Sequence, residues 1–122
     1  AARDNAKAAG VTADVTWQRG DIASLTPEAI AEIVRERGGE PGPGLLLSNP
    51  PYGERLDDAD LRALYTVIGE TMLKFRGWRA GFIVGTPLFE EVLYRIVGEP
   101  RIKKPLANAN LRAYFYLYDD GR

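Results

Sequence analysis

The chain has 122 residues, which is enough for one domain with a modest core and too few for two. Its formal charge is -1 and 27% of its residues are charged, with both signs mixed, so the composition predicts a globular protein without a polybasic arm. The chain contains no cysteine and no histidine, which excludes disulfides, thiolate nucleophiles, imidazole bases and zinc sites built from those side chains.

The first half of the sequence predicts a helix, a strand, a second helix and a second strand. Residues 1–9 favour a helix that Gly10 ends. Residues 14–19 alternate apolar and polar side chains, as a short strand does. The next helix is expected from its cap, Thr26, to Gly38. Residues 45–48, Leu-Leu-Leu-Ser, are continuously apolar and predict a strand covered on both faces.

The second half continues the alternation and closes with two strands. A helix capped by Asp57 or Asp58 is expected to end near Gly77, followed by a buried strand and a helix that starts at Thr86. Strands around residues 101–104 and 111–118 are close in sequence, so an antiparallel pair is expected. The whole pattern predicts an α/β fold with a mostly parallel sheet, helices on both faces and a terminal antiparallel hairpin.

Ligands of such sheets bind outside the carboxyl ends of the strands. Three loops follow predicted strands and are therefore the places to seek a site. They are Gly20-Asp21, Ser48 to Arg55, and Gly85 to Pro87.

The second of these loops contains Asn49-Pro50-Pro51-Tyr52. Two prolines make the backbone rigid, which lowers the entropy cost of holding the Asn49 amide and the Pro50 carbonyl in fixed directions. Two fixed acceptors suit the two N–H groups of an exocyclic amine, and the Tyr52 ring offers a stacking face for a planar base. The tetrapeptide thus predicts a site that holds an aromatic amine; the structural alternative is a rigid turn without a ligand.

The tetrapeptide resembles the catalytic motif of class I S-adenosylmethionine-dependent amino-methyltransferases. Residues 49–56, NPPYGERL, resemble the RNA guanine-N(2) methyltransferases of the RlmL type, the THUMP-associated UPF0020 family. The resemblance implies a Rossmann-like methyltransferase fold, S-adenosyl-L-methionine as cofactor, and no metal. It also implies a catalytic set consisting of Asn49, Pro50, Pro51 and Tyr52.

The same resemblance assigns further contacts. It implies that the Asp21 carboxylate binds the adenine amino group of the cofactor and that Ile22 makes an apolar contact with the adenine. It also implies that Asn49 contacts the cofactor. Arg55, together with Tyr52, is assigned to the RNA substrate. From the residues alone, Asp21 could equally be a turn or helix cap, and Arg55 could pair with a neighbouring carboxylate at the surface.

By resemblance, residues 1–122 are the C-terminal portion of one methyltransferase domain. The glycine-rich loop and the ribose-binding acidic residue of the family's first half are then expected before Ala1. The isolated chain should therefore bind cofactor weakly and be inactive. Asn108-Ala109-Asn110 departs from the Asn-Gly turn that family members often carry in the closing hairpin.

The resemblance implies methylation of the exocyclic 2-amino group of a guanine, in 23S ribosomal RNA with transfer RNA as the alternative substrate. It also implies an upstream THUMP-type RNA-binding domain. The same tetrapeptide also serves DNA adenine methyltransferases and release-factor glutamine methyltransferases, and a catalytically silent α/β binding module stays open. No apolar run reaches membrane-spanning length, so a cytoplasmic location without a membrane partner is expected. An exposed sheet edge would make the fragment self-associate.

Two patterns near the C-terminus have both a structural and a functional interpretation. Tyr114, Tyr116 and Tyr118 alternate along one strand face, which favours packing against the sheet but is also the arrangement of a platform for stacking bases. The basic cluster of Arg101, Lys103 and Lys104 favours a solvated strand face.

Overall fold

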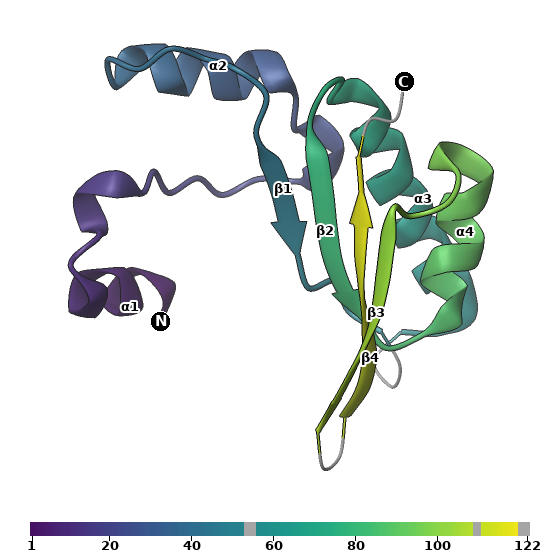
Figure 1. Cartoon of the computed structure of the whole chain (residues 1–122). Helices are drawn as coiled ribbons and strands as arrows, with labels where there is room; N and C mark the ends of the chain where they lie inside the picture. The colour runs from purple at the N-terminus through teal and green to yellow at the C-terminus, as the bar shows by residue number, and fades with distance from the viewer. Residues whose placement is uncertain (53–55, 109–110, 120–122) are drawn as a thin grey trace.

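The computed structural model describes residues 1–52, 56–108 and 111–119, without the side chains of residues 108 and 111. Figure 1 shows a twisted sheet with α3 and α4 against one face and α1 set apart from it. The α-helices are α1 (Ala2–Ala9), α2 (Pro27–Glu36), α3 (Asp58–Lys74) and α4 (Pro87–Val97). The short 3-10 helices are η1 (Thr12–Asp14) and η2 (Ile22–Ser24), and the strands are β1 (Leu45–Ser48), β2 (Arg79–Val84), β3 (Ile102–Asn108) and β4 (Leu111–Tyr118).

The sheet has the strand order β1-β2-β4-β3. β1 and β2 run parallel, with Ser48 opposite Phe82, whereas β4 is antiparallel to both of its neighbours. The α/β alternation and the terminal hairpin are confirmed. The expected parallel pairing holds for β1 and β2, and the sheet as a whole is mixed because the hairpin supplies half of its strands.

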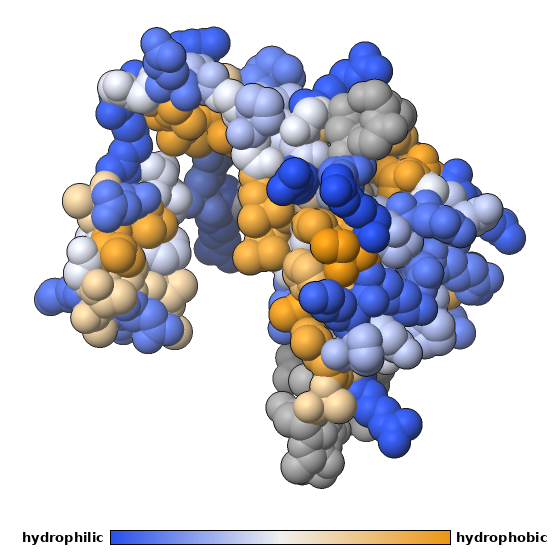
Figure 2. Space-filling model, viewed as in Figure 1, coloured by the Kyte–Doolittle hydropathy of each residue, from blue (hydrophilic) through white to orange (hydrophobic). Residues whose placement is uncertain are grey.

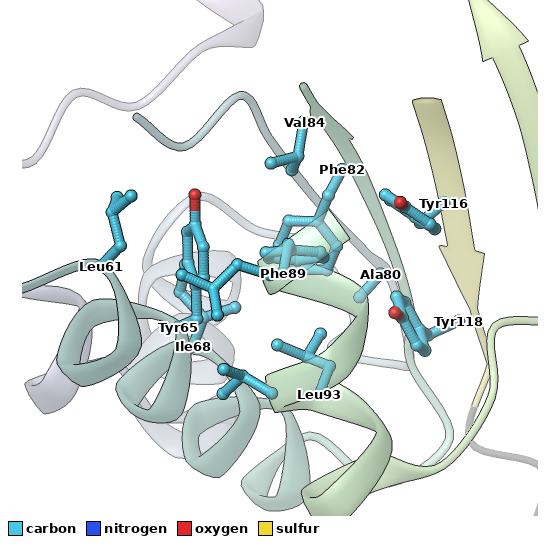
Figure 3. Packing of buried hydrophobic residues seen from close by; sticks show 12 residues of the cluster. Leu61, Tyr65, Ile68, Ala80, Phe82, Val84, Phe89, Leu93, Tyr116 and Tyr118 are labelled. Carbon is cyan, nitrogen blue, oxygen red and sulfur yellow. The ribbon is translucent and has the colours of Figure 1, made fainter. Parts of the chain in front are cut away.

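The core lies between the sheet and the pair α3 and α4, as Figure 3 shows. The ring of Tyr65 on α3 meets that of Phe89 on α4 edge to face, with centroids 5.0 Å apart. Tyr116 and Tyr118 are buried against the same cluster, so the packing interpretation of these two tyrosines is confirmed. The buried faces of both helices fill this core: Leu61, Tyr65 and Ile68 come from α3, and Leu88, Phe89, Val92 and Leu93 come from α4.

The predicted burial of the Leu45–Ser48 strand on both faces was wrong. Leu45 and Leu47 keep 54% and 69% of their surface exposed, and only Leu46 packs partly against the core. The reason is that α3 and α4 both lie on one side of the sheet, and among the described residues no helix closes on the other side of β1. Figure 2 shows the resulting apolar patch over β1.

The strand predicted over residues 14–19 was also wrong. A strand requires a neighbouring strand to accept its hydrogen bonds, and the described sheet contains none beside this segment. Instead the Arg37 guanidinium, at the end of α2, donates to the carbonyls of Ala13 and Val15 and to the Thr16 hydroxyl, the last at 2.7 Å. The alternating pattern therefore forms an extended segment that is held by a side chain.

Helix boundaries follow the capping residues that the sequence predicts. The hydroxyl of Thr26 accepts from the Ala29 amide, and the Asp57 carboxylate accepts from the Asp60 amide at 2.9 Å. Thr86 caps α4 in the same way. The described helices include none with the length and apolarity needed to cross a bilayer.

Candidate active site

The carboxyl ends of β1 and β2 lie at the same edge of the sheet because the two strands are parallel and in register. Asn49 therefore follows the last residue of β1 next to the loop that begins with Gly85 after β2. The sequence placed both loops among the candidate sites, and the structure brings them together.

The loop after β1 is clamped by the core. Pro50 is buried, and the Tyr65 hydroxyl on α3 donates a hydrogen bond of 2.8 Å to the Pro51 carbonyl. Burial, with a smaller contribution from the nearby Tyr52, raises the pKa of Tyr65 to about 12. The hydroxyl therefore stays protonated at neutral pH and keeps donating, which fixes the loop relative to α3.

The Tyr52 ring packs directly on the backbone of Gly85. A Cβ placed on Gly85 would lie 2.3 Å from Cε2 of Tyr52 and 2.8 Å from its Cδ2, so only glycine leaves room for the ring. Tyr52 is half-buried in this position. The Tyr52 ring therefore packs against the end of β2 and remains partly exposed.

The two predicted acceptors remain available. Asn49 is exposed, and within residues 1–52, 56–108 and 111–119 neither its side-chain amide nor the Pro50 carbonyl is engaged in a hydrogen bond. The neighbouring Pro51 carbonyl is the one that Tyr65 occupies. A loop restricted by two prolines and one hydrogen bond therefore carries two oxygens without a protein partner close in sequence to Tyr52, and such acceptors are of the type that can bind an amine.

Asp21 and Ile22 lie at a second part of the same edge. They line an open hollow of about 650 Å³ together with Leu47 and Ser48 of β1 and with residues of α2. One Asp21 carboxylate oxygen accepts from the Ala23 amide at 3.0 Å, so the capping role considered for this residue is confirmed. Its other oxygen has no hydrogen-bond partner in the described parts of the chain, which leaves one acceptor free at the hollow.

α3 also holds this second loop. The Thr71 hydroxyl donates to the Ile22 carbonyl at 3.4 Å, and the Lys74 ammonium donates to the Ala23 carbonyl at 2.9 Å. The same helix that fixes the loop after β1 through Tyr65 therefore fixes η2, so the two predicted parts of the site are set relative to one another.

Arg55, predicted to contact substrate, and its neighbour Glu54 lie outside the described residues. The acidic residues inside the described ranges form no cluster of three or more that could hold a metal ion.

Sequence reasoning did not identify the roles of Tyr65 and Gly85. Tyr65 lies within a predicted helix, and the available signal was that a tyrosine hydroxyl requires a hydrogen-bond partner when the side chain is buried. Gly85 lay in a candidate loop. Its contact with the Tyr52 ring, which follows a different strand, is tertiary and leaves no signal in the local sequence.

The described chain has an α/β fold with a candidate site in the loops at one edge of its sheet. Residues 1–111 match the family described as RMKL-like, methyltransferase domain, and the chain belongs to this family, UPF0020. It is 43% identical over 89 residues to a protein of Syntrophotalea carbinolica named ribosomal RNA large subunit methyltransferase K/L. A protein of the same name in Chromohalobacter salexigens is 39% identical over 90 residues. These alignments each cover 71% of this chain and 11% of the relative.

Two solved structures share the fold over 99% of this chain. One is SMU.472 in complex with SAH, with a TM-score of 0.76 and 28% identity. The other, from Clostridium difficile 630, is described as a possible methylase and has a TM-score of 0.75 and 29% identity. In both cases the match covers 28% of the solved chain, so this chain spans a small part of the proteins it resembles.

Proposed function

We propose that this chain is part of an S-adenosyl-L-methionine-dependent RNA methyltransferase that methylates the exocyclic 2-amino group of a guanine in 23S ribosomal RNA. The observation that carries the proposal is the clamped loop that presents the Asn49 amide and the Pro50 carbonyl beside the Tyr52 ring. The relatives named ribosomal RNA large subunit methyltransferase K/L support the choice of RNA over other amine-bearing substrates.

In this mechanism the target guanine stacks on Tyr52, and its amino group donates its two hydrogen bonds to Asn49 Oδ1 and the Pro50 carbonyl oxygen. These bonds draw the nitrogen lone pair away from the purine ring and stabilise the positive charge that develops on nitrogen during attack. Pro50 and Pro51 restrict the backbone of the loop, and the hydrogen bond from the Tyr65 hydroxyl to the Pro51 carbonyl ties the loop to α3. The protein contributes orientation and electrostatic stabilisation without an imidazole or thiol base.

The residues around the hollow at Asp21 fit the cofactor. A free carboxylate oxygen of Asp21 can accept from an adenine amino group, and Ile22 with the apolar residues of α2 can contact the ring. S-adenosyl-L-methionine supplies an electrophilic methyl group on a sulfonium when bound. Asn49 directly follows Ser48, which lines this hollow, and is three residues before Tyr52. The same residue can therefore contact both the cofactor and the target amine.

The remaining assignments concern the whole protein. Arg55 is proposed to bind an RNA phosphate, and an upstream THUMP-type domain is proposed to supply most of the RNA affinity, because the chain has a formal charge of -1. We place the enzyme in the cytoplasm, where ribosomal RNA is modified. The isolated chain, residues 1–122, is proposed to be the C-terminal portion of the catalytic domain and inactive by itself.

The test uses the full-length protein that contains this chain, with labelled S-adenosylmethionine and unmodified ribosomal and transfer RNA, followed by nucleoside analysis. Label is expected in N(2)-methylguanosine from ribosomal RNA. Asn49→Ala is expected to slow single-turnover transfer by about 100-fold, the effect of losing one preorganised polar group, and to change affinity for S-adenosylhomocysteine far less, because Asp21 and Ile22 keep their contacts with the cofactor. Asn5→Ala, an exposed asparagine on α1, is the matched control. An Asn49→Ala enzyme of undiminished rate would remove this residue from the mechanism.

A second candidate is methylation of adenine in DNA. One solved structure of TM-score 0.66 and 27% identity, from Listeria monocytogenes, is described as a "predicted N6-adenine-specific DNA methylase". The acceptors of the loop suit the 6-amino group of adenine equally well. Label in N(6)-methyladenine of DNA, and none in RNA, would favour this candidate; label in release factor would favour a glutamine acceptor, and no transfer would favour a binding module.

A further inference from the structure

We infer that a groove between the start of α4 and the β3–β4 hairpin binds the RNA nucleotide next to the target guanine. In this assignment Tyr114 stacks on its base and Arg112 binds its phosphate. The inference rests on the proposed function and extends it, because it names a second substrate contact outside the loop that holds the amine.

The groove adjoins the seat of Tyr52. Its volume is about 370 Å³, and its lining includes Gly85, Thr86, Pro105, Ala107, Arg112 and Tyr114. Gly85 is shared, because the Tyr52 ring also packs on it. A nucleotide in the groove would therefore be a direct neighbour of a base stacked on Tyr52.

Of the three alternating tyrosines of β4, Tyr114 is the one that is not buried in the core. Tyr116 and Tyr118 are buried, whereas Tyr114 keeps 40% of its surface exposed at the groove. Lys103 holds this ring in place, with its ammonium 4.6 Å from the ring centroid and 2.7 Å from a carboxylate oxygen of Glu90. A tyrosine held in one orientation and partly exposed is a low-entropy platform for a base.

Arg112 supplies the charge. It pairs with Ala107 across the hairpin, two residues from Tyr114 on the same strand face, and it is exposed. Within the described ranges its guanidinium forms no ion pair or hydrogen bond with the protein. β3 and β4 contain no acidic residue, and because Lys103 is ion-paired with Glu90, Lys104 and Arg112 supply the local positive charge in a chain of formal charge -1. Local positive charge complements a phosphate backbone.

The combination of an aromatic face with an adjacent free guanidinium favours an unpaired stretch of RNA over a duplex. An unpaired nucleotide exposes its base for stacking, whereas the base faces of A-form duplex are covered by their neighbours. A methyltransferase that acts on an exocyclic amine also requires the target base to be accessible, which an unpaired stretch provides.

The test measures the affinity of the full-length protein, in an Asn49→Ala background, for a labelled RNA fragment that contains the unmethylated target guanine. The readout is fluorescence anisotropy. Tyr114→Leu is expected to weaken binding by roughly 5- to 150-fold, the range for losing one stacked base, while Tyr114→Phe retains affinity. Arg112→Gln is expected to reduce the slope of log affinity against log salt by about 0.7, the value for one single-strand phosphate. Tyr94→Leu and Arg95→Gln, exposed residues of α4 away from the groove, are the matched controls.

An abasic site at the neighbouring nucleotide provides a readout that does not depend on protein folding. It should weaken binding to the Asn49→Ala protein and have no further effect in the Tyr114→Leu protein. The inference would be overturned if the abasic site lowered affinity equally in both proteins, or if Tyr114→Leu bound RNA as tightly as Tyr94→Leu. In either case, methyl transfer by the protein with Asn49 intact would still support the proposed function. Absence of transfer to any guanine would overturn the proposed function, and the inference with it.

Discussion

Replacing Gly85 with alanine tests whether the position of the Tyr52 ring matters for catalysis. The added Cβ would lie 2.3, 2.8 and 2.9 Å from three carbons of that ring, whereas non-bonded carbons normally approach to about 3.5 to 4.0 Å. The ring must therefore retreat by about 1 Å or more. A misplacement of about 1 Å in a positioning group can lower the rate roughly 100-fold.

The assay is single-turnover methyl transfer by the full-length protein with saturating cofactor and RNA. Gly85→Ala is expected to lower the rate by roughly 100-fold while S-adenosylhomocysteine affinity stays unchanged, because Gly85 does not line the hollow at Asp21. Gly42→Ala is the control, since a Cβ there meets no atom within 4 Å and the backbone needs no left-handed conformation.

A double-mutant cycle separates this mechanism from general damage. If the effect acts through the ring, adding Gly85→Ala to a Tyr52→Ala enzyme should cause little further loss, because the clash has been removed. Full additivity of the two substitutions, or a normal rate for Gly85→Ala alone, would refute the reasoning.

Two further predictions concern stability and association. Tyr65→Phe should lower the free energy of unfolding by about 1 to 3 kcal/mol at neutral pH, because the Pro51 carbonyl loses its donor. The pKa of Tyr65 rises from 10.0 to about 12 on folding, so the contribution of its hydroxyl to the free energy of unfolding is constant below pH 10 and is lost as the pH rises to about 12. The difference in free energy of unfolding between wild type and Tyr65→Phe, measured by urea titration, should therefore shrink over that interval. A difference that stays constant with pH would contradict this assignment. The isolated chain should self-associate through the exposed β1 strand, and Leu47→Glu should shift it toward monomer in sedimentation velocity, because Leu47 is 69% exposed and its loss does not open the core. A wild-type chain that sediments as a monomer at all concentrations would contradict the second prediction.

Local sequence was sufficient wherever the physical cause is local. α2, α3 and α4 begin directly after Thr26, Asp57 and Thr86, because a side-chain oxygen of each capping residue accepts from an amide that the helix leaves free. This capping depends only on a few adjacent residues. The position of Asn49 to Tyr52 after an apolar strand was equally evident, and with it the edge of the sheet at which the candidate site lies.

Local sequence failed wherever a neighbour from another part of the fold decides the outcome. Residues 14–19 carry a strand-like alternation, yet without a partner strand the segment is bound by Arg37 instead. The burial of Leu45 and Leu47 depends on a covering layer that the described chain does not provide.

The sequence by itself therefore determined the α/β class, the helix limits, and the type of chemistry that an amide, two prolines and a tyrosine can perform. Tertiary structure alone decided that the Tyr65 hydroxyl locks the Pro51 carbonyl, that Gly85 seats the Tyr52 ring, and that Tyr114 stays exposed while Tyr116 is buried. The reason is physical: capping and backbone stiffness act within a few residues, whereas burial and contact between side chains exist only after distant segments have packed.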